Sequence, residues 1–170
     1  MPNLRRPQGT RQPKVKIRLL GIGTKMPAWV ETGVAEYSKR LPPPFQFECV
    51  ELPLIHRGKN ADTARIVRQE GESLLSKIQS QDYVVALDVK GKALSTEKLA
   101  ERLADIRDRG AQLSLLVGGP DGLSDECLSR ADEKWSLSAL TLPHPLVRIV
   151  VAEQIYRGWS VLAGHPYHRA

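Results

Sequence analysis

Cysteine is scarce in this chain of 170 residues, which has only Cys49 and Cys127. Their spacing does not match a metal site, and both are expected to be reduced, buried thiols. The four histidines form no HxxxH or HExxH pair. Paired cysteines or histidines supply most structural and catalytic metal sites, so no metal is predicted. Free thiols are typical of the cytoplasm, where we expect the protein to work.

Long apolar runs and several catalytic motifs are also missing. No run approaches the ~18 residues that could span a membrane, and the N-terminus lacks the apolar core of a secretory signal. No Gly-x-Ser-x-Gly elbow or Gly-Lys-Ser/Thr phosphate loop occurs. The segment 21–26 begins like a dinucleotide fingerprint but has Met26 where the third glycine would stand. We interpret it as a tight strand-to-helix turn and predict no membrane partner.

The positive charge is concentrated at one end. Of the net charge of +6, residues 1–14 carry +4, because they contain four basic residues and no acid. This segment predicts a disordered basic extension, and an organelle transit peptide is the alternative. The rest of the chain carries only +2, so it must contact nucleic acid through local clusters. DNA is not among the predicted partners.

Strand-like and helix-like segments alternate along the remaining residues. Strands are predicted at 15–22, 45–52, 83–88, 112–117 and 135–140. Helices are predicted at 27–40, from Asn60 to about 79, from Ser95 to Gly110, after Ser124, and at 145–162. This order predicts one α/β domain over 15–170, with a mostly parallel sheet and helices on both faces.

The last predicted helix, 145–162, is apolar around most of its circumference. Such a helix must be buried on most sides. A partner subunit supplies that burial most readily to a terminal helix, so a homodimer is predicted. A helix at the centre of the core is the alternative.

Loops after the third, fourth and fifth predicted strands have the composition of a ligand site. If these strands are parallel neighbours, the loops meet at the sheet edge where α/β proteins bind ligands. The loop 118–122 is rich in glycine, and two prolines stiffen the turn 141–145. Leu137, Leu140 and Leu142 could enclose an adenine-like face whose polar edge is read by backbone groups. Ordinary surface turns are the alternative.

Two polar clusters could contact RNA. His56–Asn60 is a compact basic loop at a helix start, where Arg57 and Lys59 could hold a phosphate. The C-terminal run Gly164–Arg169 combines two histidines, a tyrosine and an arginine, which could stack on a base, accept a proton and contact a carbonyl. A solvated loop and a frayed tail are the respective alternatives.

Seven motifs carry a resemblance to a known family. In chain order they are GTKMPAWV, RGKNAD, LDVKGK, LLVGGPDGLS, WSLSALTLPHPLVR, AEQIYRGWS and HPYHR. Together they resemble the RlmH family of 23S ribosomal RNA pseudouridine N3-methyltransferases, in the SPOUT superfamily of α/β-knot methyltransferases. The resemblance covers about residues 15–169. Asp121 departs from it, because the family often has glutamate there, and residues 1–14 have no family role.

The resemblance implies a knotted α/β homodimer that uses S-adenosyl-L-methionine and no metal. The substrate would be N3 of a pseudouridine in the decoding-centre hairpin of 23S rRNA, within the assembled 70S ribosome. One protomer would hold the cofactor and the other would lend its C-terminal tail. The implied cofactor residues are Leu87, Gly118, Leu137, Ser138, Ala139, Leu140, Thr141 and Leu142.

The same resemblance suggests roles for polar side chains. Tyr167 and His168 would orient or stack the target base, while Arg169 would hold a carbonyl or phosphate and favour an ionised base. His144 is the best candidate for a general base in the cofactor loop, but His168 stays open as the proton acceptor. Arg148 could contact RNA or support the dimer.

Two other functions stay open. One is a ribosome-docking factor without turnover, against which the intact tail and cofactor loop argue. The other is a knotted methyltransferase of tRNA ribose, although the chain has no added RNA-binding domain. With a near-neutral body, isolated RNA should bind weakly.

Overall fold

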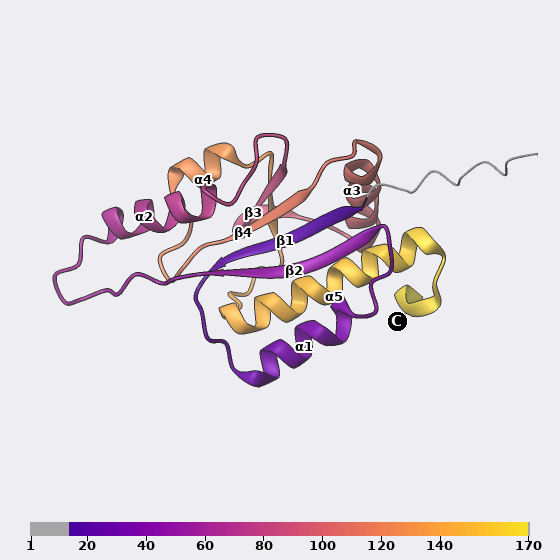
Figure 1. The fold of residues 1–170 in the computed structure, drawn as a ribbon, viewed down its shortest axis with the longest axis horizontal. Helices are drawn as coiled ribbons and strands as arrows, with labels where there is room; N and C mark the ends of the chain where they lie inside the picture. The colour runs from indigo at the N-terminus through magenta and orange to yellow at the C-terminus, as the bar shows by residue number, and fades with distance from the viewer. Residues whose placement is uncertain (1–13, 170) are drawn as a thin grey trace, which may run out of the picture.

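The computed structural model describes residues 14–169, so the expected basic extension lies almost wholly outside the described residues. Five strands form one sheet in the order β2-β1-β4-β3-β5, and every neighbouring pair is parallel (Figure 1). The strands are β1 (Val15–Ile22), β2 (Phe45–Leu52), β3 (Tyr83–Ala93), β4 (Leu113–Val117) and β5 (Glu133–Ser136). The prediction of a parallel α/β sheet is confirmed.

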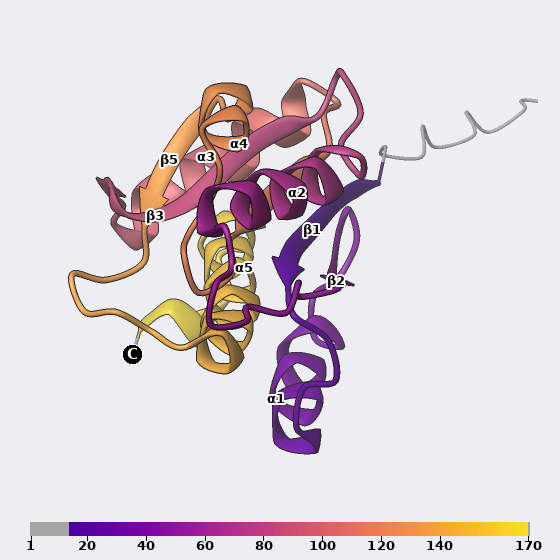
Figure 2. The same cartoon turned by 90° about the vertical axis from the view of Figure 1, so that its left-hand side faces the viewer.

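Helices cover both faces of this sheet. They are α1 (Ala28–Ser38), α2 (Thr63–Leu75), α3 (Thr96–Asp108), α4 (Asp125–Arg130), α5 (His144–Ala163) and the short 3-10 helix η1 (Pro166–Arg169). Helix α5 packs against α1 and α3, while α2 packs against α4 on the opposite face (Figure 1 and Figure 2). Of the helices within 14–169, none has the length and apolarity needed to cross a membrane.

Alternation along β1 explains the two cores. Ile17 and Leu19 point to the core that contains Val151 of α5. Leu20 points to the other core, with Leu74 of α2. Side chains of a strand alternate between the faces of a sheet, so an almost continuous apolar run is what a strand covered on both faces requires. The apolar helix α5 is therefore buried along one side by its own chain.

Most helix starts follow the predicted caps. Ser95 and Ser124 accept hydrogen bonds from backbone N–H groups in the first turns of α3 and α4. The prediction of Asn60 as the cap of α2 is wrong: Asp62 accepts from the backbone N–H of Arg65, and the helix ends at Leu75. Both side chains can cap, so the sequence did not distinguish them.

The last strand is shorter and earlier than predicted. It spans Glu133–Ser136, and residues 137–143 form a loop before α5. Strand β3 continues beyond 88 to Ala93, with an irregular register in which Leu87 and Lys92 both face Trp135. A Cβ atom on Gly91 would lie 2.6 Å from the Trp135 backbone, so glycine permits this close approach. The knotted threading of the chain stays a prediction.

Candidate cofactor cavity and C-terminal tail

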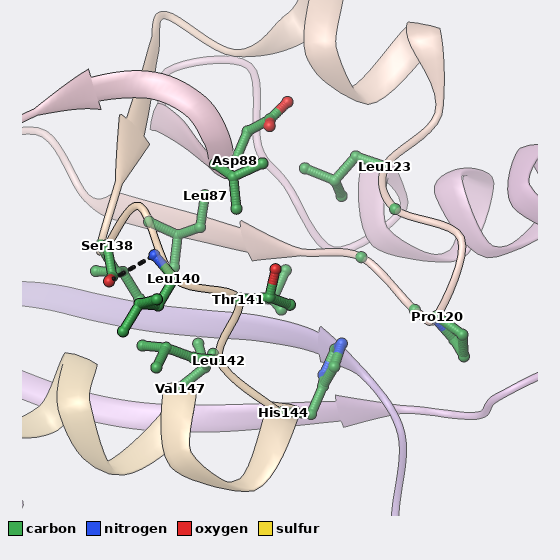
Figure 3. A pocket seen from close by; sticks show the side chains of 16 residues that line it. Leu87, Asp88, Pro120, Leu123, Ser138, Leu140, Thr141, Leu142, His144 and Val147 are labelled. Carbon is green, nitrogen blue, oxygen red and sulfur yellow. Dashed lines mark hydrogen bonds between the residues drawn. The ribbon is translucent and has the colours of Figure 1, made fainter.

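A cavity of about 360 Å³ lies at the carboxyl ends of β3 and β4, beside the loop that follows β5 (Figure 3). Its position fits the rule that open α/β sheets bind ligands at this edge. The lining residues come from β3, the end of β4, the loops after β4 and β5, and the start of α5: Leu87, Asp88, Val89, Val117, Gly118, Gly119, Pro120, Gly122, Leu123, Leu137, Ser138, Leu140, Thr141, Leu142, His144 and Val147. The predicted loops after the fourth and fifth strands meet here, whereas the third wall belongs to β3, because that strand continues past residue 88.

Seven of the eight residues expected to hold a cofactor line this cavity, and Ala139 is exposed in the same loop without lining it. Sequence reasoning missed Asp88, Leu123 and Val147. Asp88 had a usable signal, because it is the first polar residue after the buried run of β3. Val147 had none, since its position in α5 is that of an ordinary core residue.

The glycine loop, defined as Gly118–Gly122, forms one wall. A backbone bridge joins Gly119 to Gly122, and the N–H of Gly122 donates to the carbonyl of Gly119. A Cβ atom on Gly118 would lie only 2.4 Å from the carbonyl carbon of Gly122. Gly122 has a φ of +83°, which side chains disfavour. The tight turn therefore requires glycine at both positions.

The loop 137–143 forms the opposite wall. The backbone N–H of Leu140 donates to the Ser138 hydroxyl at 3.0 Å (Figure 3). The Ser136 hydroxyl donates to the Ser138 carbonyl at 3.1 Å. Leu140 itself is 76% exposed beside the cavity. A large apolar side chain held in water by a locally bonded loop is what a ligand-binding rim provides. This wall can cover an apolar ligand face.

His144 begins α5 and lines the cavity. Burial lowers the pKa of its imidazole below the usual 6.5, and a hydrogen bond with the Gly118 backbone opposes that shift. The ring is therefore neutral near pH 7 and has a nitrogen lone pair that can accept a proton. Its location satisfies the first requirement of a general base near the cavity.

The C-terminal tail folds back against the second half of α5. The Tyr167 hydroxyl donates to Glu153 Oε1 at 2.9 Å, and its ring lies edge-on to Tyr156, with ring centroids 4.6 Å apart. The Arg157 guanidinium lies over the Tyr167 ring at 5.0 Å. Burial and the bond to Glu153 raise the pKa of Tyr167 to about 12. This tyrosine is therefore a hydrogen-bonding and stacking group rather than a base.

The other two predicted tail residues sit in the final 3-10 turn. His168 is half-buried, and its Nδ1 atom is buried without a hydrogen-bond partner among residues 14–169, whereas Arg169 is exposed. The tail lies against the second half of α5, whereas the cavity is lined by residues at its start. Glu153, which Tyr167 contacts, lies nine residues after His144, about 14 Å along the helix. Tyr167 does not line the cavity of its own chain.

The predicted RNA-contacting arginines have partners within the chain. The Arg148 side chain is only 6% exposed, and its guanidinium donates to Glu51 at 2.7 Å and to the Gly23 carbonyl at 2.8 Å. This buried, paired guanidinium fixes α5 to the ends of β1 and β2, and a contact of Arg148 with RNA or a role in the dimer stays a prediction. Arg57 is likewise paired with carboxylates, while Lys59 is exposed.

Among residues 14–169, no group of three or more histidine, cysteine, aspartate or glutamate side chains is arranged to hold a metal. The cavity instead offers apolar side chains, backbone groups and one carboxylate. That donor set suits a mixed apolar and polar organic ligand.

Comparison with known families decides the identity of the fold. A family model described as predicted SPOUT methyltransferase matches residues 15–168. The chain belongs to the SPOUT methyltransferase family. Proteins named ribosomal RNA large subunit methyltransferase H from Pseudomonas putida and Ectopseudomonas mendocina are 56% and 55% identical to it. Each alignment covers 91% of this chain and all of the relative.

Solved structures with the same fold are more distant in sequence. A methylase family protein from Haemophilus influenzae gives a TM-score of 0.53 at 13% identity, covering 92% of this chain and 70% of that one. A methylase family protein from Neisseria gonorrhoeae gives 0.50 at 14% identity, covering 84% and 82%. These likenesses support the fold of this SPOUT methyltransferase, and the site rests on its own geometry.

Proposed function

We propose that this methyltransferase moves the methyl group of S-adenosyl-L-methionine to N3 of a pseudouridine in 23S rRNA, within assembled ribosomes of the cytoplasm. The observation that carries the proposal is the cavity in which seven expected cofactor residues converge. Relatives that are 56% identical are named for methylation of large-subunit ribosomal RNA. The pseudouridine and its decoding-centre hairpin come from the family resemblance.

The cavity suits the cofactor in both shape and chemistry. Leu137, Leu140 and Leu142 would cover the adenine faces, and backbone groups of the glycine loop would bond its edge. Asp88 would accept from ribose hydroxyls or the cofactor's ammonium group. When bound, S-adenosylmethionine supplies an activated sulfonium methyl. The protein's tasks are then to align the base nitrogen and to remove its proton.

A homodimer would bring the cavity and the tail together. In one chain Tyr167 contacts Glu153, about 14 Å along α5 from His144, and a second copy packed antiparallel on α5 would place its tail near the first cavity. Leu146 on α5 is 42% exposed and Trp29 on the neighbouring α1 is 53% exposed. Burying such side chains stabilises association by roughly 1.5–3 kcal/mol each.

In this assembly the tail acts on the substrate base. Tyr167, held by Glu153, would position the base, and Arg169 would hold its carbonyl and stabilise negative charge as the proton leaves. His144 would accept the proton directly or through water, because its imidazole is neutral and faces the cavity. His168 stays the competing proton acceptor, because its Nδ1 atom has no hydrogen-bond partner among the described residues.

Methyl transfer from labelled S-adenosylmethionine tests the proposal. Intact 70S ribosomes, free large subunits, naked 23S rRNA and tRNA are compared, and the label is mapped to the base. We expect label at N3 of one pseudouridine and only in assembled ribosomes. Label on tRNA ribose, or cofactor binding without transfer to any of the four RNAs, would refute it in favour of the tRNA enzyme or the docking factor.

Complementation tests the shared site. A chain with a broken cavity, Gly118→Ala, is mixed with a chain lacking the tail arginine, Arg169→Ala. If each site uses one chain's cavity and the other's tail, the mixture recovers activity, because half of the dimers are mixed and each has one intact site. The expected maximum is about one quarter of the wild-type rate. Two inactive proteins that stay inactive after exchange of subunits would contradict the composite site.

A further inference from the structure

Arg57 connects three segments that are distant in the sequence. Its Nη2 and Nη1 atoms bond Glu70 at 2.8 and 3.0 Å, and Nε bonds Asp121 at 2.8 Å. Nη1 also donates to the carbonyl of Ile55 at 2.8 Å, while the N–H of Ile55 donates to Glu70 at 3.1 Å. One guanidinium thereby joins the β2–α2 loop, helix α2 and the glycine loop.

The bonded carboxylates differ in burial. The Glu70 side chain is 3% exposed and that of Asp121 is 40% exposed. Glu70 therefore anchors the network, because a buried carboxylate requires a charged partner and so holds Arg57 in place. Arg57 uses two edges of its planar group at once, one for each carboxylate, which a lysine could not do.

The glycine loop depends on this contact for its position. Of its five residues, three are glycine and one is proline, so Asp121 has the only side chain able to make a polar bond. Asp121 is also the one loop member that does not line the cavity. The backbone of Gly119 packs against the ion pair, because a Cβ atom there would lie 3.0 Å from Glu70 Oε1 and 3.4 Å from Arg57 Nη2.

We infer that Arg57 is a positioning residue for the cofactor: it holds the glycine loop from behind through Asp121 and so fixes one wall of the cavity. This inference rests on the proposed cofactor site. It replaces the sequence-based interpretation of Arg57 as a phosphate contact, because all three nitrogens of the guanidinium have partners within the chain. Lys59 remains exposed in the same loop for RNA.

Asp121→Asn is the sharpest test, because it removes the negative charge from the contact of the glycine loop with Arg57 and leaves the buried Arg57–Glu70 pair intact. The measurements are calorimetric affinity for S-adenosylhomocysteine, kcat, and separate KM values for S-adenosylmethionine and for ribosomes. We expect the dissociation constant and the cofactor KM to rise about fivefold or more, with kcat and ribosome KM within about twofold. Asp121→Glu, which keeps the charge, should restore affinity.

Arg57→Lys keeps the positive charge but loses the planar guanidinium that bonds two carboxylates at once, and it should weaken cofactor binding about tenfold. The double variant Arg57→Lys with Asp121→Asn should bind no worse than Arg57→Lys alone, because both changes break one connection. Arg102→Lys is the matched control: Arg102 also joins two carboxylates, Asp105 and Glu133, on α3 and β5. It should leave cofactor affinity unchanged.

The outcomes separate three possibilities. A merely structural role would lower the melting temperature and the active fraction while folded molecules kept their cofactor affinity, which would overturn the inference. A raised ribosome KM with unchanged cofactor affinity in Arg57→Lys would overturn it in favour of a phosphate contact. If the wild-type protein binds S-adenosylhomocysteine and Asp121→Asn binds equally well, this inference alone fails. A wild-type protein that does not bind refutes the proposed function as well.

Discussion

The two ends of α5 carry different kinds of chemistry. At its start, the cavity is built from leucines, glycines and backbone groups, with a neutral histidine. In its second half, Glu153, Arg157 and Tyr167 form a bonded polar and aromatic cluster. The first arrangement is suited to holding a ligand and the second to orienting one. About 14 Å of helix separates His144 from Glu153, which is why we propose that the two arrangements meet across a dimer.

Removing the tail arginine should give the largest difference between the two ends. Arg169→Ala should lower kcat at least about 100-fold, because a positioned charge that stabilises a developing anion is worth that much. Cofactor affinity should stay within about twofold, since Arg169 is far from the cavity of its own chain. Single-turnover transfer to ribosomes and calorimetry with S-adenosylhomocysteine measure the two quantities.

Arg109→Ala is the control for this experiment. Arg109 is, like Arg169, an exposed arginine at the end of a helix, and its guanidinium lies over the Tyr83 ring at 5.8 Å. The Arg109→Ala variant should turn over normally. Near-normal turnover in Arg169→Ala as well would remove the tail from the reaction and leave the cavity as the whole site.

Gly118→Ala should produce the reverse pattern at the other end. The new Cβ atom would lie 2.4 Å from the Gly122 carbonyl carbon, so the turn must open. We expect cofactor affinity to fall roughly 10- to 100-fold, which corresponds to about 1.4–2.8 kcal/mol. The measurement is calorimetric, with the melting temperature as a check on folding. Gly58→Ala is the matched control, because no described atom lies within 4 Å of a Cβ atom at that position. Equal cofactor affinity in the two variants would mean that the glycine loop does not shape the site.

The sequence predicted the position of the cavity at the start of α5 better than the secondary structure of the segments that line it. Strand order placed the loops after β4 and β5 together beside β3 as expected, because parallel strands share one carboxyl edge. The prediction failed at 137–140, where a run of apolar residues was assigned to a strand but forms the cavity rim. Apolar residues serve a ligand as well as a core, and periodicity does not distinguish the two uses.

The arginines show the other limit of sequence reasoning. Arg57 was expected to face RNA because its neighbours are basic, yet its partners are Glu70 and Asp121. Arg148 was expected to be available on the last helix, yet it is buried against Glu51. These ion pairs join segments that only the tertiary fold brings together, so no local sequence pattern predicts them.

Glu153 tests whether the tail cluster is a built unit or a loose contact. Glu153→Ala removes the partner of both Tyr167 and Arg157, and should lower kcat about tenfold through misplaced Tyr167. Glu153→Gln keeps an acceptor for the tyrosine hydroxyl and should recover most of that loss. Cofactor affinity should not change in either variant. Equal kcat values in Glu153→Ala and the wild type would show that Tyr167 needs no support from α5.

The pH dependence is the mildest test and bears on both ends together. Burial lowers the pKa of His144 below 6.5, so its neutral form, the proton acceptor, persists to below that pH. As the pH falls through the lowered pKa, protonation removes the base. The fold loses stability before that, as the pH falls between the unfolded pKa near 6.5 and the lowered pKa, because only the unfolded histidine takes up a proton there. We therefore expect kcat/KM, measured between about pH 5 and pH 8, to fall only on the acid side. Tyr167, with its pKa raised to about 12, should add no basic limb in this range.

His144→Asn should lower the rate and abolish the acid limb. If the limb survives in His144→Asn, the proton acceptor does not lie at the cavity end of α5, and the tail's His168 becomes the group to replace next.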